Sequence, residues 1–257
     1  AVTTTTPAPT VALFVTCLVD AMRPRIGFAT LAALEAAGCE VVVPQGQTCC
    51  GQPALNAGDR DHAIAIAKAT IRVLEPYSTI VVPSGSCAAT IRKDYPELFA
   101  DDPAWAERAR TVAARTWEVL SYLDEVRGWR PSGVALPATA TYHDSCSGLR
   151  ELGVKRQPRR LLGAVAGLSL KPLAGEETCC GFGGTFCVKY PAISNAIVGE
   201  KAAAIDATGA DLALAGDLGC LMNMAGKLHR RGARTRCFHT IEVLAGHAEG
   251  PAIGEEG

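Results

Sequence analysis

The chain has 257 residues, of which 48% are hydrophobic and 20% charged, so it has enough apolar material for a folded core and too little charge for a disordered chain. Its 25 Lys and Arg nearly balance its 26 Asp and Glu. The formal net charge of -1 excludes a global electrostatic attraction to nucleic acid or to an anionic membrane.

Residues 1–10 are rich in Thr and Pro and predict a flexible tail. They contain neither the basic region nor the apolar region of a secretory signal, and the chain has no run of 18 apolar residues that would predict a membrane span. We therefore expect a reducing, cytoplasmic location, with any membrane association made through partners. In that compartment, many cysteines indicate metal or redox chemistry more than disulfides.

Short apolar strands alternate with helices along the chain. In the first half, the pattern predicts strands at 11–16, 40–44 and 79–83, and helices at 28–37 and 62–74. A polar helix over 104–126, through Trp117, and a Gly/Pro/Arg stretch over 128–137 form the predicted junction. In the second half, we expect strands at 138–142, 168–173 and 212–215, and helices at 159–165 and 192–208.

This alternation predicts an α/β fold built of two tandem, pseudo-symmetric Rossmann-like repeats with parallel sheets. The expected domains are residues 11–127 and 128–250.

Eight of the 11 cysteines repeat with one spacing. A single cysteine is followed 32 or 33 residues later by an adjacent pair and a glycine, and another cysteine lies 37 or 40 residues beyond the pair. The first quartet is Cys17, Cys49, Cys50 and Cys87, and the second quartet is Cys146, Cys179, Cys180 and Cys220. Each cysteine follows a predicted strand, so each quartet is expected to converge at the carboxyl ends of a parallel sheet.

Four converging thiolates suit zinc or an iron–sulfur cluster. The chain has no Cys-x-x-Cys knuckle of the kind that structural zinc sites use, and the side chains of an adjacent pair can reach different irons of one cluster. We therefore predict one or two iron–sulfur clusters per chain, preferably of the 4Fe-4S type. Zinc in one half remains an alternative, and so do buried free cysteines without a metal.

Other polar residues lie near the quartets. His143 precedes Cys146 by three residues and could ligate or hydrogen-bond a metal, or have a purely structural role. Ser84 and Asp217 each lie three residues before a quartet cysteine, and we expect them to cap a loop rather than to supply an oxygen ligand.

The other three cysteines have no counterpart in the repeat. We expect Cys39 and Cys237 in the core, and Cys187 near the second quartet but not as a ligand. Candidate cations for a substrate carboxylate are Arg92, Arg150 and Lys189, and basic stretches at 155–160 and 227–236 could contact an acidic partner.

The doubled cysteine pattern resembles the CCG cysteine-rich domain family. This family includes the B subunit of heterodisulfide reductases, the iron–sulfur subunit of glycolate oxidase and the lactate utilisation protein A family, and the likeness is strongest to the last. It is carried by residues 14–20 (FVTCLVD), 46–54 (GQTCCGQPA), 83–87 (PSGSC), 179–186 (CCGFGGTF) and 219–223 (GCLMN).

The resemblance implies an iron–sulfur subunit of an L-lactate (2-hydroxy acid) oxidising system. Electrons from the oxidation of lactate to pyruvate would pass through clusters held by the eight cysteines, and the partners would be a ferredoxin-like iron–sulfur protein and a third subunit. The full family motif ends in Cys-x-x-Cys, whereas this chain has Ser84 and Asp217 at the first of those positions. That departure argues against a noncubane cluster, while four thiolates suffice for an ordinary four-iron cluster.

Three functions stay open at this point. The chain is a subunit of an oxidoreductase of the L-lactate dehydrogenase type, a non-catalytic relay or structural zinc or iron–sulfur scaffold, or a thiol/disulfide oxidoreductase similar to heterodisulfide reductase. No Gly-x-Gly-x-x-Gly motif follows a strand, so the reaction is not expected to depend on NAD. No catalytic residue is assigned.

Overall fold

The structure is a computed structural model that describes residues 8–255. Of the predicted tail, residues 1–7 lie outside the described residues, and the first strand already begins at Thr10. Among the described helices, none is long and apolar enough to cross a membrane.

Each half of the chain contains a four-stranded sheet in which every pairing is parallel. The first sheet has the order β2-β1-β3-β4 and consists of β1 (Thr10–Leu13), β2 (Glu40–Val42), β3 (Ile80–Val82) and β4 (Thr116–Glu118). The second has the order β6-β5-β7-β8 and consists of β5 (Ala135–Tyr142), β6 (Ala166–Lys171), β7 (Leu212–Ala215) and β8 (Arg236–His239). The shared strand order confirms the prediction of two tandem α/β repeats with parallel sheets.

Helices connect and cover the strands of both sheets. In the first half they are α1 (Cys17–Met22), α2 (Pro24–Ala36), α3 (Gln52–Ala57), α4 (Arg60–Leu74), α5 (Gly85–Ala89), η1 (Thr90–Asp94), α6 (Tyr95–Leu98), α7 (Pro103–Arg115), α8 (Val119–Ser121) and η2 (Tyr122–Val126). In the second half they are α9 (Cys146–Leu152), α10 (Arg156–Leu162), α11 (Phe186–Lys189), α12 (Pro191–Ala207), α13 (Leu218–Arg230) and α14 (Thr240–Leu244).

The predicted continuous helix over 104–126 is interrupted by a strand at 116–118, and the chain is helical again over 119–126, in α8 and η2. Helix α7 ends at Arg115, and Trp117 lies in β4, which pairs with β3. This strand has only three residues and no turn residue separates it from α7, so no local signal marks it. Pairing with the buried β3 overrides the helical pattern. The first half therefore has four strands, where the sequence pattern predicted three.

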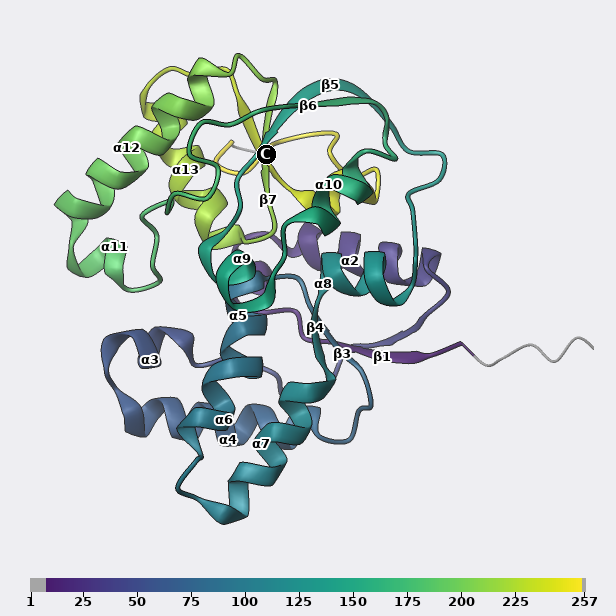
Figure 1. Cartoon of the computed structure of the whole chain (residues 1–257), viewed down its shortest axis with the longest axis vertical. Helices are drawn as coiled ribbons and strands as arrows, with labels where there is room; N and C mark the ends of the chain where they lie inside the picture. Colours follow the sequence, from purple (N-terminus) through teal and green to yellow (C-terminus); the bar gives the residue numbers. More distant parts are fainter. Residues whose placement is uncertain (1–7, 256–257) are drawn as a thin grey trace, which may run out of the picture.

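The two halves share one apolar core. The larger cluster of buried side chains includes Ile26 and Leu34 of α2 together with Leu214 of β7 and Leu244 of α14. Helix α2 packs on α14, and α10 packs on α8 and η2, so each half contributes one helix to cover the other (Figure 1). The predicted boundary at residue 127 lies in the connection between η2 and β5, and it stays a prediction.

Ion pairs to buried carboxylates join the halves at both of these contacts. Arg23 Nη2 lies 2.8 Å from Oε1 of Glu242, whose side chain is fully buried in α14. Arg160 of α10 pairs with the buried carboxylate of Asp124 in η2. A buried carboxylate needs such a partner, so these pairs fix how the halves dock.

Helices α5 and α9 meet near the centre of the molecule (Figure 1). A Cβ atom on Gly85 would lie 3.0 Å from the Cα atom of Gly148, so the two backbones touch. The Gly85 N–H also donates to the Gly216 carbonyl at 3.3 Å. This contact brings the carboxyl ends of the two sheets, and thus the two quartets, to the same region.

Candidate metal centres

The cysteines of each quartet occupy equivalent places at the carboxyl ends of the strands. Cys17 and Cys146 are the first residues of α1 and α9, directly after the central strands β1 and β5. Cys87 and Cys220 are each the third residue of a helix, α5 or α13. The adjacent pairs lie on the loops that follow β2 and β6. Each quartet therefore converges from three separate segments, as the spacing predicts.

The first quartet lines a cavity of about 260 Å³. Cys17 Sγ lies 3.7 Å from Cys49 Sγ, and the Gly51 N–H donates to Cys49 Sγ at 3.4 Å. Hydrogen bonds from the Cys17 and Cys50 thiols, with that N–H, hold the pKa of Cys49 well below its usual range. The hydrogen bond to Cys49 and burial raise the pKa of Cys17. Cys49 is thus favoured as a thiolate over Cys17 and Cys50.

The second quartet lines a second cavity of about 260 Å³. The Gly181 N–H donates to Cys179 Sγ at 3.3 Å, which repeats the Gly51 contact of the first half. Asn223 Nδ2 donates to the Cys180 carbonyl at 2.9 Å, much as the Tyr95 hydroxyl donates to the Cys50 carbonyl at 2.8 Å in the first half. In both pairs, a side chain therefore donates a hydrogen bond to the backbone carbonyl of the second cysteine.

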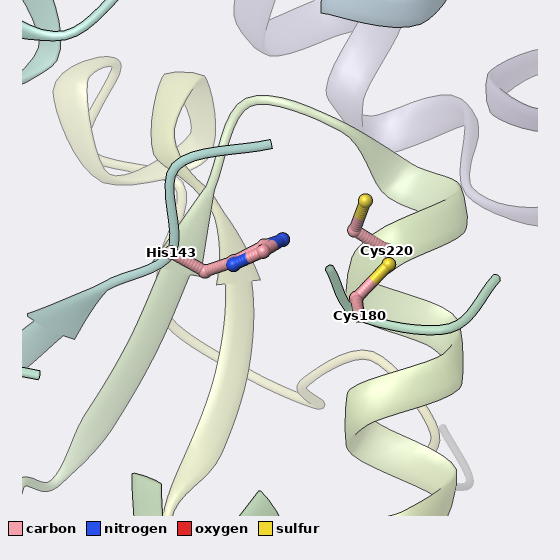
Figure 2. Close-up of side chains that lie close together, drawn as sticks. All are labelled: His143, Cys180 and Cys220. Carbon is pink, nitrogen blue, oxygen red and sulfur yellow. The ribbon is translucent and has the colours of Figure 1, made fainter. Parts of the chain in front are cut away.

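His143 joins the second quartet. One ring nitrogen of His143 and the sulfurs of Cys180 and Cys220 all lie within 4.8 Å of one another, and all three side chains are buried. In Figure 2, the ring points from the end of β5 toward the two sulfurs, which come from the loop of the adjacent pair and from α13. The donor set of this half therefore extends beyond its four thiols.

A buried cation lies behind the second quartet. Lys201 of α12 is 3% exposed, and its Nζ donates to the carbonyls of Gly175 and Glu176 at 2.5 and 3.4 Å. Burial lowers the pKa of Lys201, while the cysteines Cys180 and Cys179 act in the opposite direction. A positive charge at this place stabilises thiolates. No sequence signal marked Lys201, because its effect depends on the packing of α12 against the loop.

Ser84 and Asp217 meet between the two quartets. The Ser84 hydroxyl donates to Asp217 Oδ2 at 3.1 Å, and the Ser86 N–H donates to the same oxygen at 3.0 Å. Ser84 caps α5 and Asp217 caps α13, which confirms the predicted capping role. Their contact across the halves could not be inferred from the sequence, because 133 residues separate them.

The two cavities adjoin each other. Five residues line both of them: Gln52, Ser86, Phe182, Gly184 and Asp217. Phe182 follows the second cysteine pair, so a loop of the second half also closes the cavity of the first. The quartets therefore lie on one continuous interface between the halves.

These residues fit an iron–sulfur or zinc centre. All 11 cysteines are free thiols, and each quartet brings four soft donors to one partly buried cavity. The Gly51 and Gly181 N–H groups already point at sulfur, and such donors stabilise the negative charge of a thiolate. The first quartet could hold a centre with Cys17, Cys49, Cys50 and Cys87, and the second with Cys146, Cys179, Cys180 and Cys220.

The three cysteines outside the repeat have other surroundings. Cys39 and Cys237 are buried in the shared core, as predicted. The Cys187 thiol donates to the Gly184 carbonyl at 3.3 Å and lies outside the residues that line the two cavities. That Cys187 is not a ligand stays a prediction.

The candidate cations do not line the cavities. Arg92 donates to the Thr116 carbonyl at 2.9 Å and lies over the ring of Trp117, so it is engaged elsewhere. Arg150 and Lys189 are likewise not among the lining residues. In the basic stretch 155–160, the side chains of Lys155, Arg159 and Arg160 pair with acidic residues of this chain, which reduces the charge available to a partner.

Comparisons with known proteins agree with the cysteine pattern. The family model of the CCG cysteine-rich domain matches residues 11–92 and 140–225. "Lactate utilization protein A" of an Exiguobacterium species is 48% identical over 238 residues, covering 92% of this chain and 97% of that protein. The protein of the same name from Bacillus subtilis is 44% identical over 234 residues, covering 91% and 98%.

A solved structure shows a similar fold. The crystal structure of a hypothetical protein from Helicobacter pylori superposes with a TM-score of 0.56 at 12% identity. The match covers 98% of this chain and 51% of that chain. At this level of identity, the likeness concerns the fold alone.

Proposed function

Since the chain belongs to the CCG cysteine-rich domain family, and within it to the lactate utilization protein A family, we propose that it is an iron–sulfur subunit of an L-lactate-oxidising system. The observation that carries the proposal is the convergence of two cysteine quartets on adjoining cavities. The preferred centre is a 4Fe-4S cluster in each half.

When bound, an iron–sulfur cluster accepts and releases single electrons, which unmodified side chains do not do at ordinary potentials. The chain's own residues would hold this centre and adjust its charge. The eight cysteines supply the thiolates, while the N–H groups of Gly51 and Gly181 donate to sulfur and favour the reduced, more negative state. Burial of Cys50, Cys180 and Cys220 keeps water from part of each centre.

The lining of the cavities supports a relay role for this chain. No Lys or Arg is among the described residues that line either cavity. The second cavity instead carries the carboxyl groups of Asp94, Glu151 and Asp217. A 2-hydroxy acid is an anion, and binding it beside these groups without a cation is unfavourable. We therefore propose that lactate is oxidised on a partner and that this chain passes the electrons on.

The proposed partners are a ferredoxin-like iron–sulfur protein and a third subunit of the same system, in the cytoplasm. Disulfide reduction is the second candidate function. It is disfavoured because Ser84 and Asp217, which replace the additional cysteines, are buried and bound to each other. Neither half therefore has the fifth thiolate of the full family motif.

The first test is the content of iron, acid-labile sulfide and zinc per full chain, purified without oxygen. We expect about four or eight iron atoms with equal sulfide, and the same values in the control Cys187→Ala. The second test is lactate oxidation with an artificial acceptor. We expect activity with the partners and none with the chain alone. Stoichiometric zinc without sulfide would overturn the proposed electron transfer, and turnover by the chain alone would overturn the relay role.

A further inference from the structure

We propose that Nε2 of His143 ligates the metal held by the second quartet, so that the two halves hold different centres. The first centre would have thiolate ligands only, whereas the second would combine thiolates with one imidazole. This inference rests on the proposed metal content of the quartets, and it assigns a ligand that the cysteine spacing does not contain.

The position of His143 places its ring within reach of the same metal. The ring nitrogen and the sulfurs of Cys180 and Cys220 lie within 4.8 Å of one another, and they surround one point (Figure 2). A single metal ion with one imidazole and two thiolate ligands has bonds of about 2.0 to 2.3 Å, which holds its donor atoms within about 4.6 Å of one another, slightly closer than the 4.8 Å limit observed here. Small rotations of the three side chains would close such a site.

The hydrogen bonds of His143 leave the correct nitrogen free. Nδ1 lies 3.2 Å from the Glu176 carbonyl oxygen, which can only accept, so Nδ1 carries the proton. Nε2 then has a lone pair, and it is buried without a hydrogen-bond partner. Metal-ligating histidines have this arrangement. The ring nitrogen that does not bind the metal donates its proton to a carbonyl, and this hydrogen bond fixes the tautomer.

An unpartnered buried nitrogen is unfavourable unless something occupies its lone pair. A metal ion would satisfy the lone pair. The neutral imidazole and the buried ammonium group together suit a site whose thiolates carry the negative charge.

His239 shows why this combination is specific to His143. Its Nε2 is also buried without a hydrogen-bond partner among the described residues, but its Nδ1 accepts from the Ile241 N–H at 3.2 Å. Nε2 of His239 therefore carries the proton and has no lone pair to offer. No cysteine sulfur groups with His239 as Cys180 and Cys220 do with His143.

The first half offers an internal control. The Phe14 N–H donates to the Val81 carbonyl at 3.0 Å, and the His143 N–H donates to the equivalent Leu214 carbonyl at 2.9 Å. Phe14 therefore occupies the position of His143 in the repeat, and it has no donor atom. The first quartet thus has no imidazole at this place.

The position of Lys201 differs between the halves as well. Gly51 lies against Ala63, and Gly181 lies against the equivalent Ser194. Thr70 lies seven residues after Ala63, and Lys201 lies seven residues after Ser194. Thr70 and Lys201 therefore occupy equivalent positions. Thr70 is neutral and donates to the Cys49 carbonyl at 3.2 Å, so the first quartet also lacks the buried cation.

With His143, the second half has five candidate donors for the four ligand positions of a 4Fe-4S cluster, so the imidazole would take the place of one thiolate, and a neutral ligand in place of an anionic one raises the reduction potential. A buried cation acts in the same direction, because it stabilises the added negative charge. The second centre is therefore expected to have the higher potential, and electrons that enter the chain would settle there. The direction of transfer within the chain would run from the first quartet to the second.

The test is pulsed electron paramagnetic resonance of the reduced, full chain, grown with ¹⁴N- or ¹⁵N-histidine. The double variant Cys49→Ala/Cys50→Ala isolates the second centre. We expect a histidine nitrogen coupling that changes with the isotope. It should vanish in His143→Phe, which copies the first half, and persist in the control His62→Gln, whose side chain is 78% exposed. If the second centre contains zinc, X-ray absorption at the zinc edge counts the same nitrogen ligand.

His143→Cys is a second variant that keeps a ligand at this position. We expect it to retain the metal, to lose the nitrogen coupling and to have a lower reduction potential than the unmodified chain. A metal at the second quartet without histidine coupling would overturn this inference and leave the proposed function standing. So would a coupling that survives in His143→Phe. A chain without any metal would overturn both.

Discussion

The two halves place their cysteines alike and surround them differently. Both quartets follow the same strands of sheets with the same order, and both have a glycine N–H that donates to the first cysteine of the pair. The first quartet, however, borders on Phe14 and Thr70, and the second on His143 and Lys201. The repeat thus determines where the thiols lie, while residues outside the repeated motif determine what surrounds them.

The side chains that cap the helices after β4 and β8 also differ between the halves. Glu118 caps α8 in the first half, accepting from the Ser121 N–H at 2.9 Å, and His239 caps α14 in the second. Both side chains are buried. Burial raises the pKa of Glu118 to about 7 and lowers the pKa of His239. Equivalent positions therefore respond to pH with opposite signs.

The largest difference between the halves is expected when one cysteine pair is removed at a time. We expect Cys49→Ala/Cys50→Ala and Cys179→Ala/Cys180→Ala each to lower the metal content by about half, because each quartet holds its own centre. Metal analysis of the full chains, with Cys187→Ala as the control, measures this. If either double variant loses all of the metal, the quartets share one centre and the two-centre description is wrong.

A second test uses the pH dependence of stability. The folded-state pKa of Glu118 lies above the ordinary 4.5, so the folded state binds the extra proton between pH 4.5 and 7. The stability from protonated Glu118 is present below pH 4.5 and is lost as the pH rises through about 7, which amounts to about 3 kcal/mol. Relative to the unmodified chain, Glu118→Gln should gain about this much over that range.

Urea unfolding of both chains at several pH values measures that difference. The glutamine retains an oxygen that can accept from the Ser121 N–H, so the cap itself is preserved. His239 is unchanged in both chains and serves as the internal reference. Its lowered pKa makes the free energy of unfolding fall as the pH drops below 6.5, the ordinary pKa of histidine. A stability difference that stays constant with pH would show that Glu118 is already ionised in the folded chain.

A third test compares the two glycines where the halves touch. A Cβ atom on Gly85 would lie 3.0 Å from the Cα atom and 3.3 Å from the N atom of Gly148, and backbone atoms cannot rotate away. Gly85→Ala should therefore lower the free energy of unfolding by about 2 kcal/mol. On Gly148, the nearest atoms would lie at 3.8 and 3.9 Å, so Gly148→Ala should be neutral or stabilise α9 by up to about 1 kcal/mol.

Thermal and urea unfolding of the two variants decide this test. Because both glycines lie in helices, the difference between them isolates the close approach from helix propensity. Equal effects of the two substitutions would mean that α5 and α9 can separate without loss. The joining of the two quartets would then not depend on this contact.

Much of the site could be predicted from the sequence because its signal is local. The spacing of Cys17, Cys49, Cys50 and Cys87 and its repetition in the second half indicated both quartets, and a capping role for Ser84 and Asp217 was expected from their places three residues before quartet cysteines. The helix predicted through Trp117 was wrong, because β4 exists only through its pairing with β3. A strand of three residues has no periodicity of its own to read.

By itself, the sequence determined the α/β repeat and the loops on which the thiols lie. Alternating apolar segments, turn residues and cysteine spacing act within one stretch of chain, so they are visible without the fold. Only the tertiary structure decided which residues from distant stretches meet: Ser84 with Asp217, His143 with Cys180 and Cys220, and Lys201 with the loop behind them. These contacts arise when the halves and their helices pack, since packing sets which buried polar atoms find partners and which remain open to a ligand.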